Sequence, residues 1–568
     1  MTEPLEIVHQ RQQETTARAD RRERKPAISA ALHACLESQL LQAIFVVATF
    51  CLIAGLHRSN DGLWFQGDSP RHAANGLFWW DLIATRPASP TEFALRYYAR
   101  YPVINPIAYP PLFYLLEGSV FRAFGPSPFA AKCLVLAFGI LTGLYTMAWA
   151  RARLGAQSGW TGAFLAFVPG FVVWTNAVML NVPAAAFGIA CLYHYRKWSE
   201  SGGKKQLMAA ALAGAAAALT YYLGAIAVFI CLLWALLLSL RGQTRRRKAY
   251  WMFTAIVVAV VPLLFIARLA PVFVARHLPG VGILAHPAQW IFYIRRLPAL
   301  LGPAGLLLGL NGLAVALATA RLRREGAYLV CWILAPLLAL PILPARDLRY
   351  ILLVAPAFVI AAAIGLGPVL RFLPPNRPAF RVAALLAGLA TGIWMASLIH
   401  IPENTGFRDI SAYLRDHAPA DAVMYDGYHD GLFAFYVRAL DPNFERRIML
   451  GQELVYYRHQ ASTFRWVETV NAASTRDVVQ LLRTKSGCRW VALEVGSYSG
   501  RSPGPQLLRQ AVAGSDFTFV RSFPVSAGSA NRIDLYRMLG PVTPVTTIDV
   551  RPASYSNRIF SKIAPVTR

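Results

Sequence analysis

An aspartate, an arginine and a histidine stand close together in the first long polar stretch of this 568-residue sequence. Asp68, Arg71 and His72 are three and four residues apart, so on a helix all three side chains can face one cavity. A carboxylate in this setting can act as a general base, and the two cations can bind a phosphate group. The alternative is structural, because Gly-Asp-Ser-Pro is also a typical helix start that Asp68 would cap.

A second polar group precedes a late apolar stretch, in ARDLRYILLVAPAF. Arg346 and Arg349 can bind a phosphate, with Tyr350 beside them. They can equally be interfacial anchors whose charged ends reach lipid headgroups, which is a common role for arginine at the end of a membrane span. Both interpretations place these side chains at a membrane surface.

Three further positions carry weaker signals. His286 precedes a proline and is more often a loop residue than a ligand. Asp81 follows Trp79-Trp80 and is predicted to lie in an interfacial aromatic belt. The stretch YDGYHDG, which contains His429 and Asp430, can contact an acceptor, but a turn explains its Gly and Asp residues better.

Long apolar runs supply the frame that must position these residues. A bilayer core needs about 20 apolar residues per helix, and the sequence offers 11 such spans. They cover residues 40–56, 129–150, 160–176, 182–195, two spans within 207–240, 256–269, 300–320, 328–343, 351–370 and 382–399. The segment 109–125 is shorter, contains two charges and begins with Pro110-Pro111, so it is predicted to be an interfacial helix.

Basic residues collect in every second gap between the spans. These gaps are residues 151–153, 196–205, 241–248, 321–324 and 371–381, together with the arginine-rich start of the chain. Lys and Arg are enriched in short cytoplasmic loops, so the N-terminus is predicted inside. Eleven spans then place the C-terminus outside.

The net charge of +27 belongs mostly to this membrane pattern. Residues 401–568 carry 20 Lys and Arg against 15 Asp and Glu, which leaves +22 on the first 400 residues. Such charge suits lipid headgroups and argues against a nucleic-acid partner. Only Cys488 of the seven cysteines falls after residue 400, and no CxxC pair occurs.

Three regions follow from composition. Residues 1–39 form a disordered basic cytoplasmic N-terminus, residues 40–400 a transmembrane domain with a large first outer loop at 57–128, and residues 401–568 an extracytoplasmic α/β domain. Strands are predicted at 422–425, 490–495, 517–523 and 533–538, and helices at 432–439 and 475–482.

The order of these features resembles the GT-C membrane glycosyltransferases. The shared features are a first span, a long outer loop with Gly-Asp, a Tyr-Pro-Pro-Leu helix, spans joined by short loops, and Arg-Tyr before a late span. Within that class the chain is similar to the bacterial branch related to protein O-mannosyltransferases and lipid A aminoarabinose transferases. The resemblance covers roughly residues 40–400.

The resemblance implies an inverting glycosyltransferase in the cytoplasmic (inner) membrane. It would move a hexosyl or pentosyl group from a polyprenyl-phosphate donor to a hydroxyl of a lipid, glycan or protein acceptor at the outer face. Asp68 matches the catalytic aspartate of the first loop. The residues expected to bind substrate are Arg71, His72, Tyr109, His286, Tyr293, Arg346, Arg349 and Tyr350.

The chain also departs from the pattern of the class. Many relatives carry Glu-Lys before Pro-Pro, where this chain has Ala108-Tyr109, and an Asp where it has Asn181. A divalent cation is therefore a possible cofactor without an assigned ligand set. Two other functions stay open: a transporter or flippase for a lipid-linked substrate, and a non-catalytic scaffold. The near absence of charge inside the spans favours surface chemistry over passage.

The topology makes a first prediction. A reporter that is active only outside the cytoplasm, fused after Arg568, should be active, because residues 401–568 follow an odd number of spans. A reporter that is active only in the cytoplasm should stay silent at the same position. The opposite pattern would rule out the 11-span arrangement.

Overall fold

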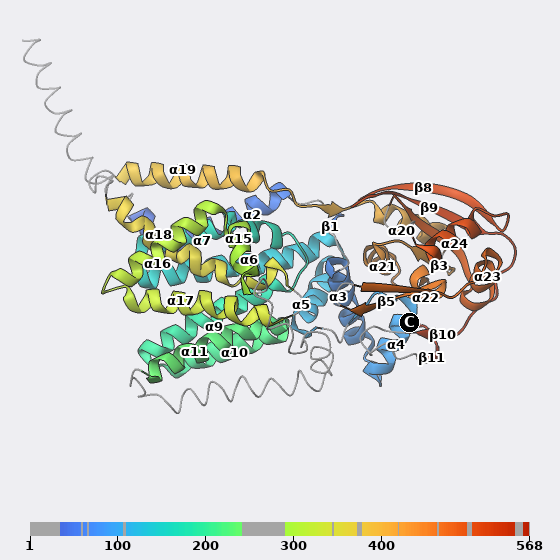
Figure 1. The fold of residues 1–568 in the computed structure, drawn as a ribbon, viewed down its shortest axis with the longest axis horizontal. Coiled ribbons are helices and arrows are strands. Elements are labelled where there is room, and N and C mark those ends of the chain that lie inside the picture. The colour runs from blue at the N-terminus through green and yellow to red at the C-terminus, as the bar shows by residue number, and fades with distance from the viewer. Residues whose placement is uncertain are drawn as a thin grey trace, which may run out of the picture.

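The computed structural model describes most of the chain. The described residues are 34–57, 61–64, 68–105, 109–240, 290–343, 346–371, 378–418, 420–462, 465–496, 502–550 and 560–566. The predicted span at 256–269 and the candidate residue His286 lie outside them. Figure 1 shows an elongated molecule with long helices in one half and a mixed α/β half at the other end.

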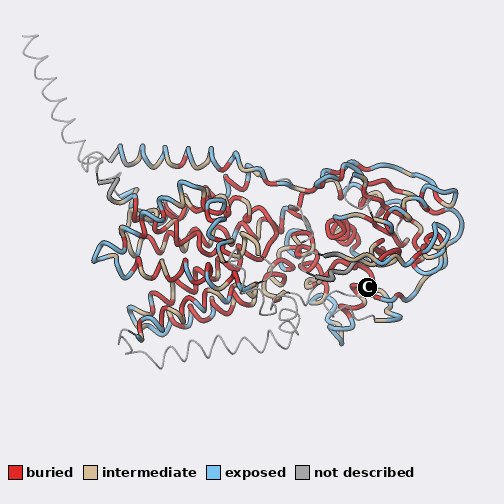
Figure 2. The backbone as a smooth tube through the Cα atoms, viewed as in Figure 1, coloured by how far each residue is buried: buried red, intermediate tan, exposed pale blue. Residues whose placement is uncertain are grey.

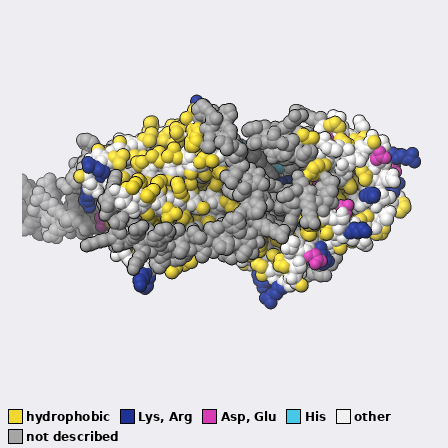
Figure 3. All heavy atoms as spheres, turned by 60° about the horizontal axis from the view of Figure 1, so that its bottom comes forward, with side chains coloured by type: hydrophobic (Ala, Val, Ile, Leu, Met, Phe, Trp, Pro, Cys, Tyr) yellow, Lys and Arg dark blue, Asp and Glu magenta, His cyan; other side chains and the backbone are white. Residues whose placement is uncertain are grey.

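The long helices lie side by side in the first half (Figure 1). They are α2 (Gln39–His57), α6 (Pro128–Leu154), α9 (Asn181–Ser201), α10 (Lys204–Thr220), α11 (Ile226–Leu240), α16 (Pro303–Ala318), α17 (Arg323–Ala339), α18 (Val354–Arg371) and α19 (Pro378–Ser397). Hydrophobic side chains cover much of the visible surface of this half, whereas charged ones gather on the other half (Figure 3). Such an exposed apolar band suits lipid contact.

Four segments of the described chain are long and apolar enough to cross a membrane by themselves. They are Gln39–His57, Pro128–Leu154, Tyr222–Leu240 and Arg323–Ile342. The pair α15 (Phe292–Leu301) and α16, bent by 109°, forms a fifth candidate. The count of 11 spans stays a prediction.

Residues 160–176, predicted as one span, are broken into short pieces. These are η1 (Ala156–Trp160), α7 (Thr161–Phe164), η2 (Leu165–Phe167) and α8 (Pro169–Trp174). The break has a local cause, because Pro169 has no N–H and Val168 before it is extended. The last piece, α8, brings Trp174 to the site described below.

Three helices of the first loop connect the two halves. They are α3 (Asp68–Thr85), α4 (Pro90–Arg100) and α5 (Leu112–Phe124). Ser89 caps α4 by accepting from the N–H of Glu92 at 3.2 Å. Helices α3 and α5 cross closely at Gly76 and Gly118, where a Cβ on Gly118 would lie 3.0 Å from the Gly76 carbonyl oxygen.

The C-terminal half is built on a five-stranded mixed sheet with strand order β4-β3-β7-β9-β8. Strands β4 (Arg447–Leu450), β3 (Ala422–Asp426) and β7 (Cys488–Val495) run parallel, and β9 (Ala530–Met538) and β8 (Phe517–Ala527) continue antiparallel. All four predicted strands are confirmed, because the buried apolar runs form the central strands and the alternating run forms the edge strand β8.

Helices and smaller sheets surround these strands. The helices are α20 (Phe407–His417), α21 (Asp430–Ala439), α22 (Gly451–Leu454), α23 (Thr475–Gln480), the π-helical η7 (Leu481–Ser486) and α24 (Pro503–Val512). The antiparallel pairs are β5 (Tyr456–Ser462) with β6 (Arg465–Val470) and β10 (Ile548–Val550) with β11 (Phe560–Ile563). Figure 2 shows buried residues throughout both halves and at their junction.

The junction between the halves is closed by paired backbone and paired charges. Strand β1 (Leu63–Trp64) of the first loop pairs antiparallel with β2 (Glu403–Asn404), at the start of the C-terminal domain. The buried Lys132 forms an ion pair with Glu403. Asp81 accepts from Arg438 at 2.6 and 2.9 Å and is 4% exposed, so the prediction that Asp81 lies in an interfacial belt is wrong.

Packing of α16 on α18 yields a stability prediction. A Cβ on Gly312 would overlap the carbonyl oxygen of Ala361 and lie 3.0 Å from the backbone N of Gly365. Gly312→Val should therefore separate the two helices, lower the thermal midpoint of the detergent-purified protein and cost about 1–3 kcal/mol. Gly305→Val in the same helix is the control, because only Leu301 lies within 4 Å of its Cβ position. Equal midpoints for the two variants would contradict this packing.

Candidate functional site

The candidate site centres on an ion pair between the first loop and a late turn. Arg349 lies in η6 (Leu348–Ile351), directly before α18, and its Nη2 donates to Oδ2 of Asp68 at 3.0 Å. Asp68 is the first residue of α3. Its side chain is 49% exposed, whereas that of Arg349 is 17% exposed. The carboxylate is therefore open to an incoming molecule, and the guanidinium is largely held within the protein.

Aromatic and polar groups fix the guanidinium of Arg349. Its Nε lies 3.4 Å from Oδ2 of Asp347, and Asp347 also accepts from the Arg349 backbone N–H at 3.0 Å. The rings of Trp174 and Tyr350 lie 5.7 and 5.6 Å from its central carbon, within cation–π range. A planar arginine held on two rings is arranged to bind a planar or tetrahedral anion.

The charge of Arg349 keeps Asp68 ionised. Burial acts to raise the pKa of Asp68, but the charges of Arg349 and Arg71 and the hydrogen bond from Arg349 outweigh it and hold the pKa below its usual 3.8. A group with a lowered pKa loses its charge only when the pH falls through that lower value. Asp68 is therefore a carboxylate throughout the neutral range.

His72 is a neutral, buried neighbour of this pair. Burial lowers the pKa of His72 to about 4, against the opposing effect of the Asp68 charge. A hydrogen bond of 2.7 Å joins its Nδ1 to the hydroxyl of Tyr114 on α5. The ring of Tyr109 meets it edge to face at 5.1 Å. His72 thus lines the site as an imidazole, whereas the sequence suggested a second cation.

A chain of tyrosine rings runs from the first loop to Arg349. The ring centroids of Tyr109 and Tyr221 are 6.0 Å apart, and those of Tyr221 and Tyr350 are 6.3 Å apart. Tyr221 and Tyr350 also line a hollow with Arg349 and Asn181. The other lining residues are mainly apolar and come from α9, η3 (Tyr222–Ala225), α11 and the two leucines before α18. The hollow is small, with a volume of about 20 Å³, so a lipid would have to widen it. A cation among apolar walls suits the head of an anionic lipid.

Sequence reasoning did not single out Tyr221, Trp174 or Asn181 as site residues. Tyr221 stands in an uncharged turn between two apolar runs, and this position was its only signal. Trp174 reaches the site because the predicted span breaks at Pro169 and the short helix α8 ends at Trp174. Asn181, noted in the sequence only as a departure from relatives, is brought to Arg349 by the start of α9.

The remaining predicted residues divide into two groups. Tyr293 on α15 is fully buried and lies near Arg346, Asp347 and Tyr350. Arg71 is instead turned to the C-terminal domain, where its Nη2 donates to Asp430 at 2.9 and 3.2 Å. Phosphate binding by Arg71 stays a prediction, and the geometry gives this residue another partner.

Within the described part of the chain, no three His, Cys, Asp or Glu side chains gather closely enough to hold a metal ion. The two positions where the GT-C resemblance implies acidic residues are Ala108, outside the described residues, and Asn181. A divalent cation therefore stays a prediction without an assigned ligand set.

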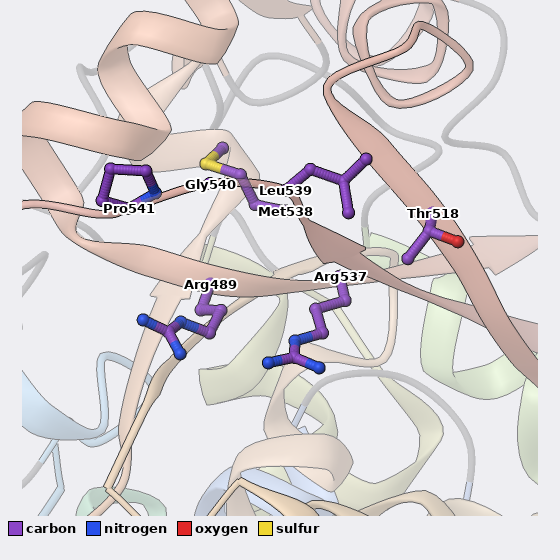
Figure 4. A pocket seen from close by; sticks show the side chains of 7 residues that line it. All are labelled: Arg489, Thr518, Arg537, Met538, Leu539, Gly540 and Pro541. Carbon is purple, nitrogen blue, oxygen red and sulfur yellow. The ribbon is translucent and has the colours of Figure 1, made fainter.

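A separate hollow in the C-terminal domain lies away from this chemistry. Figure 4 shows Arg489 and Arg537 projecting side by side at this hollow, which Thr518 and residues 538–541 also line. Arg489 is near the start of β7, whereas Asp430 follows the end of β3. Because β3 and β7 are parallel, Arg489 and Asp430 lie at opposite ends of the strands. Asp430 contacts Arg71 beside Asp68, so this hollow is at the far end of the sheet from the candidate site.

Comparisons with known proteins identify the fold. Residues 108–266 match the family model described as dolichyl-phosphate-mannose-protein mannosyltransferase. No curated protein matches the chain in sequence. The structure of ArnT from Cupriavidus metallidurans bound to undecaprenyl phosphate matches with a TM-score of 0.57 and 16% identity, over 88% of this chain and 99% of that one. This chain has the GT-C fold.

Two more structures extend the GT-C match. AglB from Archaeoglobus fulgidus, in complex with an inhibitory peptide and a dolichol-phosphate, has a TM-score of 0.53 and 12% identity over 84% of this chain and 72% of that one. Arabinofuranosyltransferase AftD from Mycobacteria has a TM-score of 0.51 and 15% identity over 88% and 40%. The resemblance to the GT-C glycosyltransferases is thereby confirmed, and with it the order of a helical domain with candidate membrane spans and a C-terminal domain.

Proposed function

We propose that this protein is an inverting glycosyltransferase that moves a sugar from a polyprenyl-phosphate donor to an acceptor hydroxyl at the outer face of the cytoplasmic membrane. The observation that carries the proposal is the pair of Asp68 and Arg349 at 3.0 Å. In this pair a half-exposed carboxylate lies beside a largely shielded cation that lines a hollow with mainly apolar walls. The GT-C fold supports the same chemistry.

The hollow suggests how the donor would bind. The phosphate would meet Arg349 and Tyr350, with Tyr221 beside them, and the first isoprene units would follow the apolar wall formed by residues such as Leu352 and Leu353. Arg349 would then stabilise the negative charge that develops on the leaving phosphate. Preorganised hydrogen-bond donors of this kind are most effective where water is excluded, and the side chain of Arg349 is mostly shielded from water.

Transfer would proceed by a single displacement. The acceptor oxygen attacks the anomeric carbon from the face opposite the phosphate, the bond from that carbon to the phosphate oxygen breaks, and the acceptor proton passes to a carboxylate oxygen of Asp68. The products are an inverted glycoside and the polyprenyl phosphate. His72, neutral and hydrogen-bonded to Tyr114, would line the site without taking the proton.

Donor binding would also strengthen the base. The charge of Arg349 lowers the pKa of Asp68, which makes the carboxylate a weak proton acceptor. A phosphate that binds Arg349 would offset part of this positive charge, so the pKa of Asp68 would rise towards the range useful for general base catalysis. The base would then act mainly when a donor is present.

Lipid mass spectrometry tests the proposal as a whole. Extracts of cells that lack the protein should accumulate a lipid-linked sugar and an unmodified acceptor. Adding the purified protein to such an extract should move a mass equal to one sugar between them. Movement of the donor across vesicle membranes without transfer would support a flippase, and binding without transfer would support a scaffold.

The role of Arg349 gives a direct binding prediction. Arg349→Ala should weaken binding of undecaprenyl phosphate by about 2 kcal/mol, or about thirtyfold in Kd, because a charge-assisted contact is lost. Arg349→Lys should recover part of the loss, since it keeps the charge and lacks the planar fork. Titration calorimetry in detergent measures the Kd for undecaprenyl phosphate of the parent and of both variants. Arg295→Ala on α15, an exposed arginine, is the control. Equal affinities for all variants would make Arg349 a lipid anchor only.

The role of Asp68 predicts the effect on turnover. Asp68→Asn keeps the size of the side chain and cannot accept the proton, so transfer in the extract assay should fall by about 10²–10⁴ while undecaprenyl phosphate still binds. Asp61→Asn is the control, because Asp61 lies in the same loop and contacts Tyr436 through its backbone carbonyl. Transfer by folded Asp68→Asn at close to the parent rate would reduce Asp68 to a helix-starting residue.

A further inference from the structure

We infer that helix α21 of the C-terminal domain holds the helix that carries Asp68 in its reactive position, with Asp430 as the positioning residue that acts through Arg71. The inference rests on the proposed function and gives the C-terminal domain a part in the same site. It predicts that substitutions in the C-terminal domain lower the turnover rate without changing the affinity for the donor.

The first observation is an ion pair beside the site. Asp430 begins α21, and Arg71 lies one turn after Asp68 on α3. Both carboxylate oxygens of Asp430 accept from Arg71, at 3.2 and 2.9 Å. Asp430 also accepts from the side chain of Gln452 at 3.0 Å and from the backbone N–H of Gly431 at 2.7 Å. Asp430 is 3% exposed, whereas the side chain of Arg71 is 43% exposed, so the buried carboxylate is the anchor of the pair.

The second observation is a matching pair at the other end of the same two helices. Arg438, in the last turn of α21, donates to Asp81, near the end of α3, at 2.6 and 2.9 Å. The acid lies on α21 in the first pair and on α3 in the second. Helix α21 is therefore joined to α3 at both ends, and the two helices run in the same direction.

The third observation is direct packing between these contacts. A Cβ on Gly431 would lie 3.2 Å from Cγ of Arg71 and 3.3 Å from Cβ of Pro70. A side chain at position 431 would therefore push the first turn of α21 and the first turn of α3 apart by a few tenths of an ångström. Asp68 belongs to that same turn of α3, so its position depends on the contact.

The two end pairs differ in what they should do. Arg438 and Asp81 are both buried, with side chains 10% and 5% exposed, so their loss should reduce the amount of folded protein. The side chain of Arg71 is 43% exposed, so its loss should be tolerated in folding. A small displacement of a reacting group can cost up to about 10²-fold in rate. The Asp430–Arg71 pair should therefore affect turnover more than stability.

A double-mutant cycle in the extract assay tests the inference. The proteins are the parent, Asp430→Asn, Arg71→Gln and the double variant. Each single variant should lower kcat about tenfold or more, with the donor KM and the Kd for undecaprenyl phosphate within about twofold of the parent. If Asp430 acts through Arg71, the double variant should be no worse than the Arg71→Gln variant.

Matched variants separate positioning from general damage. Glu453→Gln changes a carboxylate that accepts from Tyr98 at 2.7 Å on the neighbouring helix α4, and it should keep kcat within about twofold of the parent. Gly431→Val, which moves α3 without changing a charge, should lower kcat as the ion-pair variants do. If Asp430→Asn does not fold, Arg71→Gln and Gly431→Val carry the same test.

The outcomes are distinct from failure of the proposed function, in which the parent itself transfers no sugar. With an active parent, unchanged kcat in Arg71→Gln and Gly431→Val would overturn the inference. Losses that add in the double variant, or a loss confined to the donor KM, would also overturn it. A shared loss of kcat with constant donor affinity would establish Asp430 as a positioning residue.

Discussion

Asp68 and Arg349 stand 281 residues apart in the chain and meet at 3.0 Å. The pair is half open to water at Asp68, whose side chain is 49% exposed, and mostly shielded at Arg349, whose side chain is 17% exposed. It holds the first loop on the turn before α18, where Trp174 and Tyr350 flank the guanidinium. In the proposed function, a phosphate that binds Arg349 would offset its charge and strengthen Asp68 as a base, so one cation would link donor binding to proton transfer.

Much of the frame could be predicted from the sequence because its signals are local. Apolar runs predicted most of the long helices, short buried apolar runs predicted β3 and β7, and alternation predicted β8. The order of motifs also brought Asp68 and Arg349 into one hypothesis, and the structure places them in contact. The predicted span at 160–176 is broken, because a hydropathy window does not register that Pro169 interrupts the hydrogen-bond ladder.

The rest of the site depends on contacts between distant segments, which no local pattern encodes. Tyr221 joins the site only through the packing of three helices. Arg71 was expected to face a phosphate, but the nearest buried anion is Asp430, 359 residues later. Asp81 beside two tryptophans matches an interfacial belt, yet it pairs with Arg438 across the junction. In each case the partner lies in the C-terminal domain or in a separate helix, so pairing across the fold decided the outcome.

A structure of the protein with bound undecaprenyl phosphate tests the central claim most directly, because it shows whether one cation serves both the base and the donor. The account predicts that the phosphate contacts Arg349 and Tyr350, that the chain follows the hollow lined by Tyr221, and that the distance from Arg349 to Asp68 grows beyond 3.0 Å. A phosphate bound elsewhere, with the Asp68–Arg349 pair unchanged, would contradict it.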